Sequence, residues 1–371
     1  MTLAPKNPWI RMILVNVALM IALFIYKVFQ EYGIGYTHLL VDYHFGFIRR
    51  ALIGAFLSLL VRAVPHWAVL ALGIVVWLAT LGLFLKLFRR TYGFDEGQLP
   101  LFVFVAGSPL FLKNFIQTIG YFDIYGCLFA VILLLAPARS TVYLLLASVM
   151  SLILVLIHQI HFLMYVPTIG VIVMMRYFLV AGFTIANTTL GFICYMGITA
   201  AFLLAQFRGA VSVPLEEFTA HLYAKANPDM IPILRPDIWY RTLSDELRDT
   251  RSVFVHNAYR FPIYWGAIAL HAPLIAFMAR ATRSLANYWH RRIVLLSIAA
   301  VTLGCLIIFG IAFDYARWVA NWATCMVLIM FAMRALPTSR PAAPIPADHA
   351  GTQILAWIVT AIPRLGTISP F

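Results

Sequence analysis

Lone carboxylates beside apolar runs are the residues of this chain best suited to chemistry. Only 14 Asp and Glu residues occur among 371, and half of them lie within residues 208–260. Most of the others stand next to hydrophobic segments, as Glu31, Asp42, Asp123 and Asp314 do. Because an ionisable group at membrane depth is costly and usually functional, each is a candidate site residue.

The composition indicates a helical membrane protein. Hydrophobic residues make up 63% of the chain and charged residues 11%, and the mean hydropathy is +0.90. Since about 20 apolar residues cross the hydrocarbon core, we expect an all-α polytopic transmembrane bundle of about ten spans, within roughly nine to eleven. The expected spans lie near residues 10–29, 67–87, 100–118, 121–137, 141–158, 160–175, 179–205, 261–279, 292–312 and 316–334.

The basic residues predict an orientation. With the N-terminus in the cytoplasm and residues 51–64 not crossing, the cytoplasmic segments hold fourteen basic and three acidic residues, in line with the positive-inside rule. Gly54, Arg62 and Pro65 favour an interfacial or re-entrant helix in residues 51–64. Both termini are then cytoplasmic, and the lone carboxylates face outward from the inner (plasma) membrane. Since the positive charges flank apolar runs, nucleic acid is not expected as a partner.

Four regions follow from this pattern. Residues 1–205 form an N-terminal transmembrane module whose first outer loop is 30–66, and residues 206–260 form an extracytoplasmic cap loop. Residues 261–334 supply the C-terminal transmembrane helices, and residues 335–371 a cytoplasmic tail. Within that tail, residues 352–365 are expected to form a short amphipathic interfacial helix.

The first outer loop carries the densest group of polar residues, the string DYHFGFIRR from Asp42 to Arg50. If this segment is helical, Asp42 and Arg49 lie on nearly the same face. The carboxylate suits a general base, and the arginines, with His44 beside them, suit binding of a phosphate or diphosphate. The alternative is an interfacial ion pair, with Arg50 extending to lipid headgroups.

Two more carboxylates stand at expected helix ends. Asp123 opens the span near 121–137, where the helix dipole alone could explain a negative charge. Asp314 and Arg317 lie one helical turn apart. They form either a local ion pair within the aromatic belt or a contact to a lipid-linked phosphate.

Two further groups of residues leave several interpretations open. His158 and His161, three residues apart, could bind a metal, hydrogen-bond a substrate or cap a helix; a divalent metal is compatible with this pair but not required by it. In the cap loop, Trp239, Tyr240 and Arg241 could contact a sugar or acceptor, while most other charges there form a solvated surface. The four cysteines lie in apolar segments without metal-ligand spacing and are interpreted as packing residues.

These strings resemble the GT-C superfamily of integral membrane glycosyltransferases. GYFDIYGCLFAVILLLA, residues 120–136, resembles their short helix with an aspartate and many leucines, and DYHFGFIRR stands where their first-loop aspartate is expected. GFIRRALIG and FDYARW are also similar to a group of uncharacterised bacterial multispan proteins, often thought to be glycosyltransferases or polysaccharide polymerases. The chain departs from the superfamily in having a single first-loop aspartate and no soluble outer domain at its C-terminus.

The resemblance implies roles for five residues. Asp42 would be the general base that activates the acceptor hydroxyl, and Asp123 a second acidic group that supports a metal or the acceptor. Arg49, Arg50 and Arg317 would bind the phosphate of a polyprenyl carrier.

The expected function is transfer of a sugar from a polyprenyl-phosphate or polyprenyl-diphosphate donor to a glycan or a lipid-linked acceptor, outside the cytoplasm. One alternative is a polymerase or ligase of O-antigen or another polysaccharide, which would rely on arginines of the outer loops. Another is a transporter or flippase of a lipid-linked anionic substrate, although the sequence shows no paired unwound helices of the transporter kind. A scaffold subunit is the remaining option.

Overall fold

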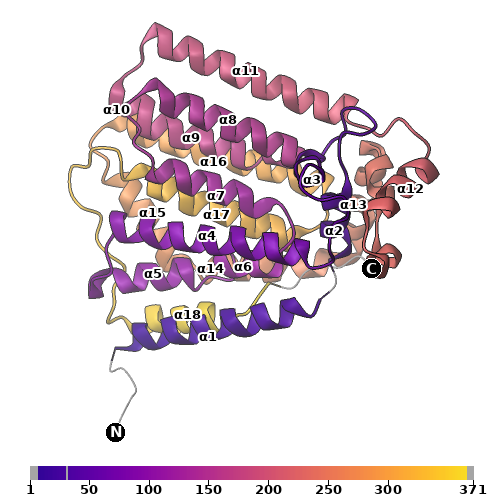
Figure 1. Ribbon diagram of the computed structural model, residues 1–371. Coiled ribbons are helices and arrows are strands. Elements are labelled where there is room, and N and C mark those ends of the chain that lie inside the picture. Colours follow the sequence, from indigo (N-terminus) through magenta and orange to yellow (C-terminus); the bar gives the residue numbers. More distant parts are fainter. Residues whose placement is uncertain (1–6, 31, 366–371) are drawn as a thin grey trace.

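Helices form every regular element in the part of the chain that the computed structural model describes, residues 7–30 and 32–365 (Figure 1). Glu31 lies outside these ranges. Two isolated bridges, between Val64 and Ala226 and between Leu285 and Thr338, are the β-type pairings there. The predicted all-α class is therefore confirmed.

Six helical segments in the described residues are long and apolar enough to cross a bilayer. They are α1 (Pro8–Val28), α4 (Ala68–Thr91), the continuous run Gln159–Phe178, α11 (Ile185–Arg208), α16 (Tyr288–Ile311) and α17 (Tyr315–Met333). A bent pair, α14 (Phe261–Ala269) and α15 (Ala272–Arg283), would make a seventh. The structure thus confirms a helical bundle with several membrane-spanning segments.

The expected span over residues 100–118 is broken. It consists of α5 (Leu99–Ala106) and α6 (Leu112–Gln117), with Pro109 between them. Proline has no amide hydrogen to continue a helix, and Ser108 Oγ accepts from the Leu110 amide instead, at 3.0 Å. Together with the α14–α15 pair, this gives two interrupted helices where the sequence had suggested continuous ones.

The other helices vary in length. Two shorter apolar ones, α7 (Asp123–Leu135) and α8 (Thr141–Ile157), would be about 20 and 25 Å long. The run Gln159–Phe178 combines η2 (Gln159–Phe162), α9 (Tyr165–Val173) and η3 (Met174–Phe178). The remaining short elements are η1 (Glu96–Gln98), α10 (Leu179–Ala181), η4 (Pro228–Ile233), η5 (Pro236–Tyr240) and η6 (Ala258–Arg260).

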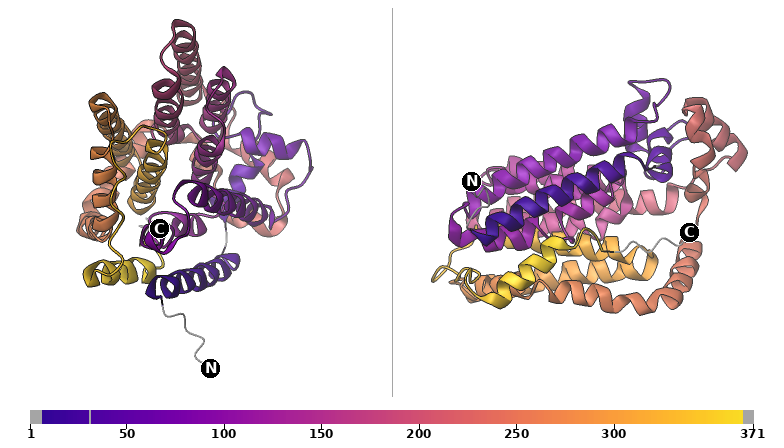
Figure 2. Two further views of the ribbon diagram at one scale, coloured as in Figure 1. Left: turned by 90° about the vertical axis from the view of Figure 1, so that its left-hand side faces the viewer. Right: turned by 90° about the horizontal axis from the view of Figure 1, so that it is seen from below.

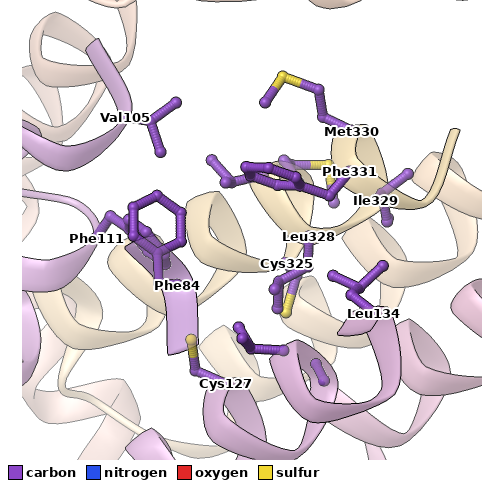
Figure 3. Close-up of a cluster of buried hydrophobic side chains, with 14 of the residues drawn as sticks. Phe84, Val105, Phe111, Cys127, Leu134, Cys325, Leu328, Ile329, Met330 and Phe331 are labelled. Atoms are coloured by element: carbon purple, nitrogen blue, oxygen red, sulfur yellow. The ribbon is translucent and has the colours of Figure 1, made fainter. Parts of the chain in front are cut away.

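Helix α17 occupies the centre of the bundle. Figures 1 and 2 show the long helices side by side, and α17 packs against α7, α9 and α16. Two of its own side chains, Phe331 and Cys325, lie near Phe84, Phe111 and Cys127 of neighbouring helices in Figure 3. All four cysteines are free. Cys127, Cys305 and Cys325 pack among apolar side chains, as predicted, and Cys194 is half-buried.

The first outer loop and the cap loop meet at one end of the bundle, at the right in Figure 1. The first loop contributes α2 (Gly33–Leu40) and α3 (Leu52–Ser58), and the cap contributes α12 (Leu215–Lys225) and α13 (Leu243–Asn257). Helix α3 would be only about 10 Å long, too short to cross a bilayer. Residues 41–51 form turns rather than the helix that would have aligned Asp42 with Arg49.

The last helix belongs to the bundle. Helix α18 (Ala350–Ala361) packs along α1 and α5 (Figures 1 and 2) rather than standing apart as the expected interfacial helix of residues 352–365. Lys113 Nζ donates to the carbonyls of Thr360 (2.6 Å) and Ile362 (3.2 Å). Free carbonyls at the end of a helix carry partial negative charge, so this buried ammonium fixes the end of α18 against α6.

Candidate active site

A polar cavity of about 430 Å³ lies where the first outer loop and the cap meet the ends of the long helices. Among the described residues, its lining includes five cationic side chains: Lys27, Arg50, Arg235, Arg241 and Arg317. It also includes two carboxylates, Glu246 and Asp314, and two histidines, His38 and His158. Three of the five cations pair with carboxylates. Lys27 and Arg50 form no ion pair with a described carboxylate, so these two make the cavity suit an anionic ligand.

Arg50 is held in the cavity in an unusual way. Its φ of 62° lies in the left-handed region, which costs a residue with a side chain about 1–2 kcal/mol. Its Nε donates to Gln159 Oε1 at 3.1 Å, and no described carboxylate lies within ion-pair distance of it. Burial, with Arg49 nearby, lowers the pKa of Arg50 to about 9. Glu246, which also lines the cavity, opposes this lowering in part. Arg50 is thus a half-buried cation that makes no ion pair with a described carboxylate.

Arg317 is fixed by Asp123 at the junction of α7 and α17. The guanidinium makes a two-pronged ion pair, in which Nη2 donates to Asp123 Oδ1 at 2.8 Å and Nε donates to Oδ2. Its central carbon lies 4.6 Å from the Tyr121 ring centre and 4.5 Å from that of Trp318. The Asp123 side chain is only 1% exposed, so it positions Arg317 and does not open to the cavity.

Asp314 is the carboxylate that this cluster presents to the cavity. Its Oδ2 lies 3.8 Å from Arg317 Nη1, and 29% of its side chain is exposed. Burial raises the pKa of Asp314, and Arg317 opposes that rise only in part. The structure therefore unites Asp123, Asp314 and Arg317, which the sequence had treated as two separate helix ends.

Two of the three neighbouring histidines line the cavity. His38 and His158 do so with their ring centres 6.4 Å apart, whereas His161 is fully buried behind them. Burial lowers the pKa of His38 well below its ordinary value, and Arg50 adds to this, so His38 is neutral at pH 7. Among the described residues, no group of three His, Cys, Asp or Glu residues is placed to hold a metal.

Arg49 binds the cap instead of facing the cavity. Its Nη2 donates to the carbonyl of Arg241 at 2.7 Å and more weakly to that of Trp239 at 3.3 Å. The Trp239 indole donates back to the Arg49 carbonyl at 3.0 Å and is 1% exposed, so its ring does not face a sugar. The Tyr240 hydroxyl donates to the carbonyl of Val213. Arg49 and Trp239 thus join the two outer loops, whereas the Tyr240 bond lies within the cap.

The cap supplies its own charges to the cavity. Arg241 lines it and pairs with Asp249 at 2.8 Å, and Arg235 pairs with Asp237 at 3.0 Å. Both arginines thus already have counterions. Glu246 also lines the cavity, whereas Trp239 and Tyr240 are not among its lining residues.

Asp42 lies outside the residues that line the cavity and is paired with α12. Its Oδ2 accepts from Lys225 Nζ at 2.8 Å, and its Oδ1 lies 3.2 Å from His221 Nε2. His44 stacks on His221 with ring centres 4.5 Å apart. Burial alone would raise the pKa of Asp42, but the bonds from Lys225 and the His44 amide outweigh it, so the pKa is lowered. The expected pairing with Arg49 is wrong, because the segment between them is not helical.

We predict that Asp42→Asn lowers stability by about 2 kcal/mol at neutral pH, the usual value of a hydrogen bond to a charged group. A carboxyl with a lowered folded pKa stabilises the protein above its unfolded pKa, about 3.9, and that stability is lost as the pH falls through the folded value. Thermal unfolding from pH 7 to 3 should show the variant and the wild type converging in acid. Asp348→Asn, at an exposed position, is the control; equal behaviour of both variants would contradict the prediction.

Comparison with protein-family models, with curated proteins and with solved structures finds no match for this chain. The site is therefore interpreted from its own geometry.

Sequence reasoning missed several residues of the cavity. Lys27 sits at the end of the first span, where a basic residue on the outer side runs against the positive-inside pattern and could have drawn notice. Gln159 interrupts an apolar run between two histidines, which is a similar signal. Arg235 and Glu246 lie in a loop with many other charged residues, so no local pattern distinguishes them. His38 lies among residues that show no pattern typical of a site.

Proposed function

We propose that this protein is a membrane glycosyltransferase that takes a sugar from a polyprenyl-phosphate or polyprenyl-diphosphate donor and passes it to a glycan or lipid-linked acceptor. The observation that carries the proposal is Arg50, a half-buried cation that makes no ion pair with a described carboxylate, in a cavity at one end of the bundle. A phosphate would supply the missing counterion, and a guanidinium binds phosphate with paired hydrogen bonds.

The proposal includes a topology. The cavity end of the bundle faces the extracytoplasmic side of the inner membrane, and α1 starts from the cytoplasmic side, with about ten spans when short and broken helices are counted. In this orientation Leu365, which packs with Tyr264 and Tyr315 near the cavity end, lies on the extracytoplasmic side and not in the expected cytoplasmic tail. The excess of basic residues on the opposite side supports this orientation. A lipid-linked donor would then place its phosphate in the cavity at headgroup level.

The described side chains suggest a division of roles. Asp314 is the general base: it takes the proton of the acceptor hydroxyl as the acceptor oxygen bonds to the anomeric carbon. The bond between that carbon and the donor phosphate oxygen breaks, and the carrier phosphate leaves with both electrons. Arg50 and Arg317 stabilise its charge, and Asp123 holds Arg317 in place.

The test is sugar transfer by purified protein in vesicles. Polyprenyl-phosphate donors carrying different radiolabelled sugars would be supplied with lipid extract from the producing cells as a source of acceptor. Labelled product that forms only with protein supports the proposal. The proposal would be overturned if the donors raise the thermal unfolding temperature of the protein, which shows that they bind, but no glycosidic bond forms.

We predict that activity depends on pH through Asp314. A base with a raised pKa is ionised, and therefore active, only above that value, so kcat/KM should rise with pH through a midpoint above the ordinary 3.9 of aspartate. Asp314→Asn should cut kcat at least about a hundredfold and remove this rise. If the Asn variant keeps the wild-type pH profile, Asp314 is not the base. Asp348→Asn, at an exposed position outside the cavity lining, serves as the control.

A transporter or flippase of a lipid-linked anion is the second candidate. One observation favours it: two interrupted helices, α5–α6 and α14–α15, meet at their breaks, as in many transporters. Vesicles that move a lipid-linked sugar across the bilayer without making a glycosidic bond would select this function. A polymerase or ligase of polysaccharide repeats would instead make product while tolerating Asp314→Asn but not Arg50→Gln.

A further inference from the structure

A second, apolar cavity of about 520 Å³ is lined by residues of α5, α15, α16 and α17. Helices α14 and α15 meet at an angle of 58°, and the hollow left by this bend is closed by α16, α17 and the α5–α6 break. Trp322 lines this groove, whereas Trp318, one turn earlier on α17, lines the polar cavity. The two cavities are therefore distinct, and only a few residues of α17 separate them.

The polar groups at the inner end of the groove are already satisfied. His271 lies in the break between α14 and α15, with Nδ1 2.7 Å from the Ala267 carbonyl and Nε2 2.8 Å from Ser108 Oγ. Ser108 lies in the break of the other interrupted helix, so this contact joins the two breaks. A hydrocarbon chain in the groove would therefore not deprive His271 or Ser108 of a hydrogen-bond partner.

The groove has the length of one membrane leaflet. From His271 to Arg283 the chain rises about 18 Å at 1.5 Å per residue, compared with about 15 Å for half the hydrocarbon core. On α16 its lining is confined to the first half, Arg291 to Ile298. Asp314, in the polar cavity, follows the far end of that helix, so the groove occupies the half of the membrane away from the polar cavity.

Two arginines stand at the mouth of the groove. Arg283 and Arg291 line it, and no described carboxylate lies within ion-pair distance of either. Arg291 Nε donates to the Leu285 carbonyl at 2.8 Å. This hydrogen bond orients the guanidinium and leaves its two terminal NH2 groups able to bind a ligand. An apolar slot one leaflet deep with two cations at its opening matches a lipid with an anionic headgroup.

We infer that the groove binds one anionic phospholipid, whose phosphate lies between Arg283 and Arg291 and whose acyl chain runs toward His271. The tail of a donor bound by its phosphate in the polar cavity would enter from the opposite end and would not use these arginines. The lipid site therefore stands independently of the proposed glycosyltransferase activity.

The test compares lipids on the purified protein. Native mass spectrometry after extraction in mild detergent, and thermal unfolding in nanodiscs of phosphatidylglycerol or phosphatidylcholine, would report retention and preference. The wild type should retain phosphatidylglycerol at least roughly tenfold better than phosphatidylcholine. The double variant Arg283→Gln, Arg291→Gln should lose the preference, and Ala279→Phe, which fills the groove, should lose retention while both arginines remain.

The matched control removes two charges elsewhere on the same side of the bundle, Arg89→Gln with Arg139→Gln, and should leave the preference unchanged. Equal retention of both lipids by the wild type, or equal loss in the control and the groove variant, would overturn the inference. So would a retained polyprenyl lipid displaced by Ala279→Phe but not by loss of the arginines, because the groove would then hold the substrate tail.

Discussion

Replacing Arg50 by glycine should reduce substrate turnover by about a hundredfold while leaving the protein as stable as the wild type or about 1 kcal/mol more stable. The loss follows from removal of a two-pronged, charge-assisted contact to phosphate. The gain in stability follows from the φ of 62°, which glycine adopts without strain, and from the removal of a half-buried cation that makes no ion pair with a described carboxylate. Turnover in vesicles and thermal unfolding in detergent measure the two effects.

Arg50→Gly is informative because turnover should fall while stability is kept or rises, whereas most inactive variants of membrane proteins are also less stable. Arg50→Gln keeps the backbone strain and should be inactive without the gain. Arg62→Gln, at an exposed position in the same loop, is the matched control and should change neither quantity. A stable Arg50→Gly protein with full turnover would remove the main support for phosphate binding in the cavity.

Membrane-spanning helices could be predicted because their signal is local. Apolar side chains in an unbroken stretch identify a span without knowledge of its neighbours, and the expected span 316–334 agrees with α17, Tyr315–Met333. The same method failed at residues 100–118, where the window averaged over the Gly-Ser-Pro break. Hydropathy also could not show that α17 is the central helix and α11 a peripheral one, because both sequences are similarly apolar.

The site could be predicted only as a set of unusual residue types. Scarce carboxylates and arginines near apolar segments marked Asp123, Asp314, Arg317 and Arg50 as candidates, because a charge at membrane depth is costly. Which partner each one takes depends on chain segments far apart in sequence. Asp42 illustrates this: its partner Lys225 lies 183 residues away, and nothing near Asp42 distinguished an ion pair within the outer loops from a catalytic base.

Removing Asp123 alone should destabilise the protein by about 3–5 kcal/mol, the usual cost of leaving a buried charge without its partner. In Asp123→Leu, Arg317 would remain between Tyr121 and Trp318 with only Asp314, at 3.8 Å, to offset its charge. Unfolding by denaturing detergent, followed through tryptophan fluorescence, measures the change.

The double variant Asp123→Leu, Arg317→Leu separates a structural role from a functional one. Since a buried ion pair gains little over well-packed apolar side chains, the double variant should recover most of the lost stability, to within about 1 kcal/mol of the wild type. It should nevertheless stay inactive, because Arg317 no longer reaches the carrier phosphate. If the losses in stability simply add, the two side chains are not coupled and Asp123 does not position Arg317. If instead the double variant is both stable and active, the pair serves folding alone, and Arg50 must bind the phosphate without it.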